Sequence, residues 1–220
     1  MKPRVLGWLA VGLLAVTATH RTSAATFVFD TEPFAGSAAL TTPGRQVVGG
    51  ETFINAFDVA TDVLVFDEAV FGIGTLHFVN DVVGNLPASG VNMIVLQTFD
   101  DDANAGTPFG AGNAANLIAT QITAPGAGFF IYFNSGLNLP RLVFSTDLDD
   151  NTADLQILAR FTGFENEPGA MATFTDANVA TRRVPEPGTL ALLVLGLAAL
   201  CGAQRRRVAR ANGFTRSRRR

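Results

Sequence analysis

The chain has 220 residues, of which 16 are lysine or arginine and 19 are aspartate or glutamate, and its formal net charge is −3. Eleven of the basic residues lie before residue 26 or after residue 203, so residues 26–183 keep five arginines against 18 acidic residues, a net charge near −13. Such an acidic region does not suit nucleic acid, whose phosphates attract basic surfaces. The one cysteine, Cys201, lies outside this region, which excludes disulfides and thiol chemistry from it.

The first 25 residues have the three parts of a secretory signal peptide. Two basic residues come before an apolar run over residues 5–16, and the small residues Ser23, Ala24 and Ala25 follow. A charged start, a short apolar run and a small-residue cleavage site are typical of export signals, and the run is too short to span a membrane. We therefore expect the Sec translocon to export the chain and signal peptidase to cut it after Ala24 or Ala25.

Residues 26–183 are expected to form one β-rich domain. They contain ten short runs of β-branched and aromatic residues, separated by clusters of Gly, Pro, Asn and Asp. The runs are 26–30, 51–58, 63–66, 75–79, 92–99, 117–122, 128–133, 142–145, 155–161 and 172–175. Short strands at such spacing predict an all-β fold, and we expect a two-sheet antiparallel sandwich of the jelly-roll kind.

Phenylalanine dominates the expected core. Seventeen of the 18 phenylalanines lie in residues 26–183, where tyrosine occurs once, at Tyr132, and tryptophan does not occur. Phe at alternating positions of a strand is suited to filling the space between two sheets. The run 155–161 also fits the period of a short helix, but its alternation of apolar residues from Leu155 to Phe161 favours a strand.

Two acidic loops could bind calcium. Each places three oxygen-bearing side chains at every second position, as the first half of an EF-hand loop does. The six residues are Asp100, Asp102 and Asn104 in the first loop and Asp147, Asp149 and Asn151 in the second. Neither loop continues with the Gly at position six and the Glu at position twelve of that pattern. The alternative is a solvated turn, because Asp and Asn also hydrogen-bond their own backbone in turns.

Catalytic motifs are sparse in residues 26–183. His77 is the one histidine after the signal, and the alternation of residues 75–79 places it on the outer face of a strand. The region has no G-x-S-x-G elbow, no Walker A motif, no dinucleotide fingerprint and no zinc ligand set. A pair of carboxylates acting as a glycosidase stays open as an alternative, because 18 acids contain many pairs.

The C-terminal end combines a short motif, an apolar run and an arginine cluster. The motif is Val184-Pro185-Glu186-Pro187-Gly188, which cannot form a helix or a central strand because of its two prolines. An uncharged run over residues 190–203 follows, and the cluster is Arg205, Arg206 and Arg207. Counted from Pro187 to Ala203, the uncharged stretch just reaches the length of a membrane helix. The arginines after it are typical of an anchor whose end stays in the cytoplasm.

This order of parts resembles the PEP-CTERM sorting signal of Gram-negative bacteria. The resemblance covers residues 184–210, and the basic extension over residues 211–220 departs from it. It implies that an exosortase recognises Pro185, Glu186 and Pro187 while the apolar run holds the chain in the inner membrane. An ordinary single-span anchor without cleavage is the alternative.

Together these features predict an exported, exosortase-sorted protein of the cell surface or extracellular matrix. The family resemblance implies a non-enzymatic role linked to exopolysaccharide and biofilm. A secreted hydrolase acting on polysaccharide and a calcium-dependent carbohydrate-binding module are the two alternatives. No cofactor is expected apart from the calcium considered above.

Overall fold

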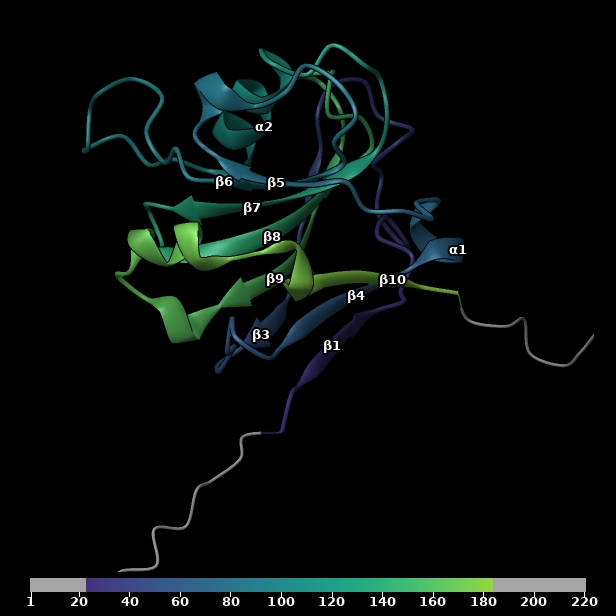
Figure 1. Ribbon diagram of the computed structural model, residues 1–220. Helices are drawn as coiled ribbons and strands as arrows, with labels where there is room; N and C mark the ends of the chain where they lie inside the picture. The colour runs from purple at the N-terminus through teal and green to yellow at the C-terminus, as the bar shows by residue number, and fades with distance from the viewer. Residues whose placement is uncertain (1–22, 184–220) are drawn as a thin grey trace, which may run out of the picture.

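The computed structural model describes residues 23–183, which form two β-sheets and two α-helices (Figure 1). The smaller sheet has three strands in the order β1-β4-β10, and both pairs are parallel. Its strands are β1 (Thr26–Phe29), β4 (Val63–Asp67) and β10 (Val179–Arg182). The first and last strands of the described chain therefore flank the same central strand.

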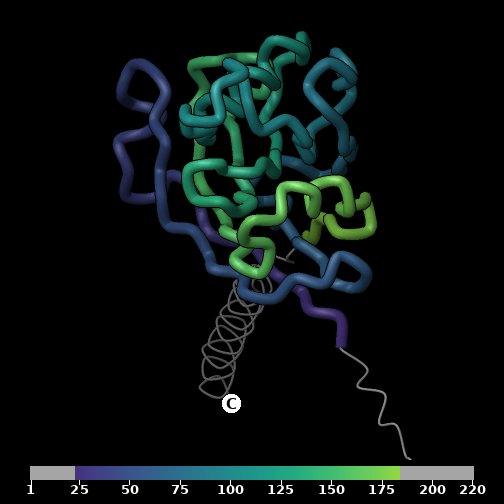
Figure 2. The backbone as a smooth tube through the Cα atoms, turned by 90° about the vertical axis from the view of Figure 1, so that its left-hand side faces the viewer, coloured from purple at the N-terminus to yellow at the C-terminus, as the bar shows by residue number. Residues whose placement is uncertain are grey.

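The larger sheet has seven strands. Six lie in the order β2-β9-β8-β7-β6-β5, and β3 pairs with β9 beyond the end of β2. They are β2 (Val47–Val48), β3 (Thr52–Ile54), β5 (Phe78–Asp81), β6 (Met93–Leu96), β7 (Gly128–Asn134), β8 (Leu139–Ser145) and β9 (Leu155–Phe161). The connection from β1 to β4, purple to blue in Figure 2, contains β2 and β3 and runs along one side of the molecule.

The expectation of an antiparallel jelly roll was wrong. Of the eight strand pairings in the described residues, only β7–β8 and β8–β9 are antiparallel, and the other six are parallel. Parallel neighbours need a crossover between them, and β6 reaches β7 through α2 (Ala111–Ala119). Clusters of Gly, Asn and Pro mark both hairpin turns and crossover loops, so they do not distinguish the two kinds of sheet.

Two predicted strands are helical in part and contain no strand. Residues 117–122 belong in part to α2, whose buried residues are Ala111, Ala114, Ala115 and Ile118. That spacing places the four residues on one face of a helix. The predicted run began only at Leu117, so it left out three of them. Residues 172–173 end η3 (Pro168–Thr173). The remaining short helices are α1 (Glu68–Phe71), η1 (Val83–Asn85), η2 (Thr162–Phe164) and η4 (Asp176–Asn178).

Phenylalanine fills the space between the two sheets, as predicted. Phe66 of the smaller sheet stacks on Phe129 of the larger one with ring centroids 3.9 Å apart. Phe71 of α1 meets both Phe129 and Phe144 edge-on, at 5.0 and 5.1 Å. The two sheets are therefore packed face to face over an aromatic core, and the run 155–161 is a strand, as expected.

The larger sheet is covered on its second face as well. Figure 1 shows α2 above β5, β6 and β7 of this sheet, and β4 and β1 below β7 and β8. Ile118 of α2 packs there with Ile94, Phe130 and Tyr132 of the sheet. Burial from both sides explains why all seven residues of β7 are buried, since a strand covered on both faces is apolar throughout.

In residues 23–183 no helix has both the length and the hydrophobicity needed to cross a membrane. The predicted tail span, residues 190–203, and the apolar run of the predicted signal peptide lie outside the described residues.

Candidate functional site

The predicted sorting residues follow directly after the last strand. Val184, Pro185, Glu186 and Pro187 lie outside the described residues, as do Cys201 and the arginines at 205, 206 and 207. The structure does describe the place from which they emerge, which is the end of the edge strand β10. The sorting signal thus begins where the smaller sheet ends.

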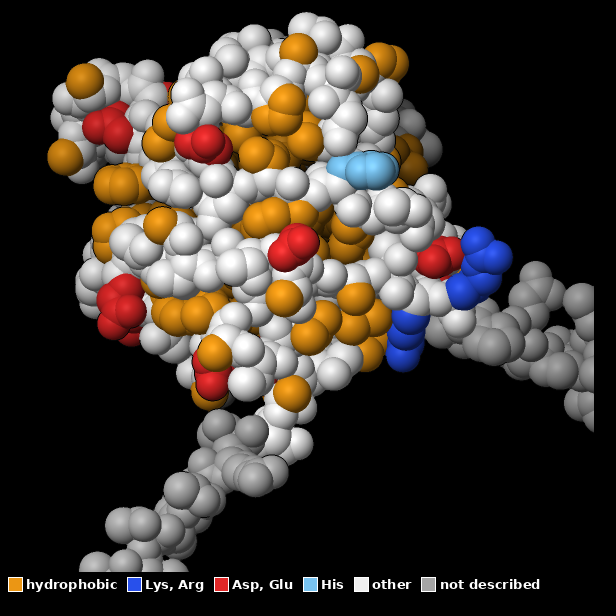
Figure 3. All heavy atoms as spheres, in the orientation of Figure 1, with side chains coloured by type: hydrophobic (Ala, Val, Ile, Leu, Met, Phe, Trp, Pro, Cys, Tyr) orange, Lys and Arg blue, Asp and Glu red, His pale blue; other side chains and the backbone are white. Residues whose placement is uncertain are grey.

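Two ion pairs hold this end of the chain against the domain. Arg182 Nη2 lies 2.8 Å from Asp30 Oδ2, just beyond β1, and Arg183 Nε lies 2.8 Å from Glu68 Oε2 in α1. The Thr181 hydroxyl donates to the Gly74 carbonyl at 3.0 Å. Figure 3 shows basic side chains gathered at one edge of the molecule, while acidic side chains are scattered singly over the face in view.

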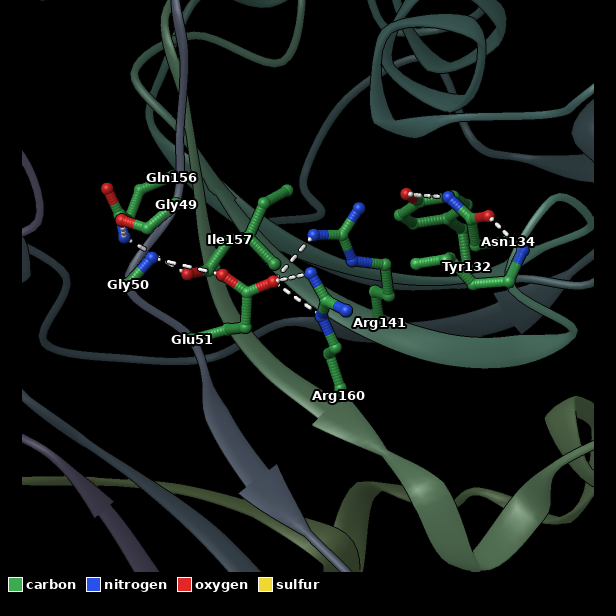
Figure 4. A network of polar contacts seen from close by, with 10 residues as sticks. Gly49, Gly50, Glu51, Tyr132, Asn134, Arg141, Gln156, Ile157 and Arg160 are labelled. Atoms are coloured by element: carbon green, nitrogen blue, oxygen red, sulfur yellow. Dashed lines mark hydrogen bonds and ion pairs between the residues drawn. The ribbon is translucent and has the colours of Figure 1, made fainter.

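A polar cluster on the larger sheet was not predicted. Glu51 lies in the break between β2 and β3, and its carboxylate pairs with Arg141 of β8 and Arg160 of β9 (Figure 4). Glu51 Oε1 lies 3.0 Å from Arg141 Nη2, and Oε2 accepts the Gly50 N–H at 3.0 Å. The break requires Gly50, whose φ of 120° is a conformation that residues with a Cβ rarely adopt.

The Glu51 carboxylate is strongly held in its charged form. Its side chain is 9% exposed. Burial by itself would raise the pKa, but the backbone N–H groups of Glu51 and Gly50 and the Arg160 guanidinium outweigh it and lower the pKa of Glu51 to about 2. Gln156 completes the break by donating from Nε2 to the Gly49 carbonyl at 3.0 Å. This cluster joins the end of β2 and the start of β3 to β8 and β9. A carboxyl group with so low a pKa is ionised near neutral pH and does not suit the role of a general acid.

The first acidic loop forms a chain of turns. Asp100 Oδ1 accepts the backbone N–H of Asp102 at 3.0 Å, and Asp102 Oδ1 accepts that of Asn104 at 2.9 Å. Asn104 Oδ1 in turn accepts the Gly106 N–H at 3.1 Å. The alternate spacing thus serves the loop's own backbone, as the turn interpretation expects. Exposed carboxylate oxygens of Asp100, Asp101 and Asp102 nevertheless lie within 4.8 Å of one another.

The second acidic loop divides its side chains between two places. Asp147 Oδ1 accepts the N–H groups of Gly126 at 2.9 Å and Asp149 at 3.0 Å, which ties the loop to the segment just before β7. Asp149 and Asn151 line an open hollow of about 290 Å³ beside the end of α2. Hydrogen bonds from the backbone and hydroxyl of Thr152 lower the pKa of Asp150 in the same hollow.

We expect millimolar calcium to shift the melting temperature by less than about 1 °C. Asp100, Asp102 and Asn104 in the first loop and Asp147 in the second already accept backbone hydrogen bonds, so a cation would have to compete with these turns. Thermal unfolding followed by circular dichroism, with calcium and then with excess chelator, measures this directly. A rise of several degrees with calcium that the chelator reverses would contradict the expectation and favour a calcium-dependent module.

The residues considered for catalysis or sugar stacking are placed as follows. His77 is exposed, as predicted, but it lies just before β5 and not within a strand, and its backbone N–H donates to Asn92 Oδ1 at 2.7 Å. Tyr132 is fully buried, so its ring is not open to a sugar. Phe53, 60% exposed, and Phe99, 42% exposed, are the most exposed aromatic rings of the described residues. The Arg160 guanidinium lies 5.5 Å from the centre of the Phe53 ring.

Acidic pairs line three hollows of the described residues. Asp30 and Glu32 line one of about 170 Å³, and Asp58 and Asp62 line one of about 470 Å³. The third is the hollow of about 290 Å³ at the second acidic loop. Wherever the pKa of a carboxyl group in residues 23–183 is shifted, it is lowered. The acid of a glycosidase pair requires a raised pKa instead.

A comparison with protein families locates the sorting signal. The family described as the PEP-CTERM protein-sorting motif matches residues 183–207. The prediction made from Pro185, Glu186 and Pro187 is therefore confirmed: the chain carries a PEP-CTERM motif and has the sorting signal of an exosortase substrate. No curated protein and no solved structure matches the chain.

Proposed function

We propose that this protein is a non-enzymatic component of the cell surface or extracellular matrix that works with exopolysaccharide in biofilm. The observation that carries the proposal is the PEP-CTERM motif at residues 183–207. The motif implies export, transient anchoring through the tail and transfer to the surface by an exosortase. The Sec translocon and signal peptidase act first, at the predicted signal peptide.

The position of the motif supports release of an intact domain. Pro185 comes three residues after Arg182, the last residue of β10. The ion pairs of Arg182 and Arg183 with Asp30 and Glu68 lie before Pro185, so a cut at or after Pro185 removes none of these contacts. The smaller sheet would therefore keep all three strands after processing.

The proposed role needs contact with polysaccharide. The exposed rings of Phe53 and Phe99 offer apolar faces on which sugars can stack. The net charge near −13 of residues 26–183 disfavours direct contact with an acidic polymer. A neutral exopolysaccharide is therefore the better match.

Exchanging Glu186 for alanine should keep the protein in the inner membrane. In the native host, we expect the wild-type protein in the medium or matrix without its tail, and the Glu186→Ala variant in the membrane fraction with its tail attached. Immunoblots of cell fractions measure the distribution.

The chain contains its own matched control. Glu167-Pro168-Gly169 repeats the tripeptide Glu186-Pro187-Gly188, but it lies at the start of η3 in the folded domain. The Glu167 side chain is exposed and caps no helix, so Glu167→Ala should be sorted like the wild type. Equal release of the Glu186→Ala variant and the wild type would contradict exosortase sorting.

A further inference from the structure

A buried carboxylate lies beside the predicted signal-peptide cleavage site. Asp62, just before β4, is 6% exposed. Its Oδ1 accepts the Ala25 N–H at 2.7 Å, and its Oδ2 accepts the Asp58 N–H at 3.0 Å. These two backbone hydrogen bonds lower the pKa of Asp62, and the one from Asp58 has the larger effect. The carboxylate is thus held in its charged form, with little of its own surface exposed, at the edge of a hollow of about 470 Å³.

This charge has no cationic partner among residues 23–183. The ion pairs in that part of the chain engage Glu51, Asp30 and Glu68. A buried charge is ordinarily paired, because removing it from water costs several kcal/mol. The closest donor to Asp62 is the backbone nitrogen of Ala25, one of the two residues that signal peptidase is expected to leave at the new N-terminus.

We infer that signal peptidase cuts between Ala24 and Ala25, and that the new ammonium group of Ala25 forms an ion pair with Asp62. Hydrolysis of the amide bond adds one water, with the hydroxyl going to the Ala24 carbonyl carbon and the hydrogen to the Ala25 nitrogen. The new carboxylic acid releases a proton and the new amine takes one up. A neutral N–H donor 2.7 Å from Asp62 Oδ1 thereby becomes a charged one, which makes the hydrogen bond stronger.

A cut one residue later would remove two contacts. Asp62 Oδ1 would lose the Ala25 donor and keep only the Thr61 hydroxyl, at 3.2 Å. The backbone N–H of Val63 would lose its acceptor, the Ala25 carbonyl, at 3.0 Å. The residues around the site leave room for a charged terminus, because Ser23, Ala25 and Asp62 line the hollow of about 470 Å³.

The composition of the chain makes the new terminus easy to observe. Lys2 is the single lysine, and it lies in the predicted signal peptide. The processed protein therefore has one primary amine, its α-amino group. The exported protein is isolated from its host, its N-terminal residue is identified by mass spectrometry, and its reaction with an amine-reactive acetylating reagent is followed by intact mass.

We expect Ala25 at the N-terminus. In the native state, acetylation of its α-amino group should be roughly tenfold slower than in the Asp62→Asn variant, because raising the pKa of an amine by one unit lowers its free-amine fraction tenfold. Asp154→Asn is the matched control. Asp154 is also buried and accepts two backbone N–H groups, but they come from Leu40 and Gln46 and not from Ala25. This variant should lose stability too, yet its terminus should react at the wild-type rate.

Two results would overturn the inference. One is a terminus at Thr26 in the exported wild-type protein. The other is wild-type acetylation as fast in the native state as in urea. The second comparison needs no variant, so the inference stays testable if Asp62→Asn does not accumulate. The inference rests on the export step of the proposed function. Tail processing does not enter either result, so a failure of exosortase sorting would leave both results unchanged.

Discussion

Exchanging Glu51 for glutamine should lower the free energy of unfolding by about 3 kcal/mol near neutral pH. The lowering of the Glu51 pKa from 4.5 to about 2 corresponds to this loss, because each unit is worth about 1.4 kcal/mol. The variant also leaves Arg141 and Arg160 on the sheet without their carboxylate, and Arg141 is 13% exposed. Removing one partner of a buried ion pair is costly because the remaining charge is left buried without a partner.

The effect should depend on pH in a defined direction. The folded pKa of Glu51 is depressed, so its contribution is fully present above about pH 4.5 and is lost as the pH falls toward about 2. Urea unfolding of the wild type and the Glu51→Gln variant at a series of pH values measures this. Plotted against pH, the free energies of unfolding of the two proteins should converge as the pH falls toward about 2.

The exposed Glu165, which makes no described ion pair, provides the control. Glu165→Gln should leave the free energy of unfolding within about 0.5 kcal/mol of the wild type at every pH. If Glu51→Gln behaved like Glu165→Gln, the carboxylate would not hold the strand ends as described.

Exchanging Phe129 for alanine should lower the free energy of unfolding by about 3–5 kcal/mol. Phe129 is fully buried, and its ring contacts Phe66, Phe71 and Phe144, which come from β4, α1 and β8. Its removal opens a cavity where the two sheets meet, and the surrounding rings can collapse into it only in part. Chemical denaturation measures the loss.

Phe99→Ala is the matched substitution at the surface. Phe99 is 42% exposed and stacks edge-on against Phe133 alone among the aromatic contacts of the described chain. We expect a loss of about 1 kcal/mol for this change. Equal losses for Phe129→Ala and Phe99→Ala would show that the aromatic core between the sheets is not the main source of stability.

The sequence predicts the composition of the core better than the topology. Alternating apolar residues identify β9, and the abundance of phenylalanine predicts an aromatic layer between two sheets, both of which the structure has. Alternation does not tell which strand is the neighbour or in which direction it runs. The parallel pairing of β6 with β7 depends on α2, whose buried face was hidden because four of its nine residues are alanine.

Of the polar features, the sequence shows the sorting motif but not the Glu51 cluster. The sorting motif is local, since Pro185, Glu186 and Pro187 are consecutive and their meaning does not depend on the fold. The Glu51 cluster joins residues 90 and 109 positions apart, so no spacing in the sequence reveals it. A weak signal existed, because Gly49-Gly50-Glu51 interrupts an apolar stretch in a domain that has only five arginines to balance its acids.

The intact mass of the wild-type protein recovered from the medium or matrix of its native host tests the central claim most directly. The account predicts a species that begins at Ala25 and ends before the apolar run at residue 190, and therefore lacks the arginines at 205, 206 and 207. A protein found in the inner membrane with residues 190–220 still attached would contradict it. That result would identify the tail as a permanent anchor and remove the main support for a matrix function.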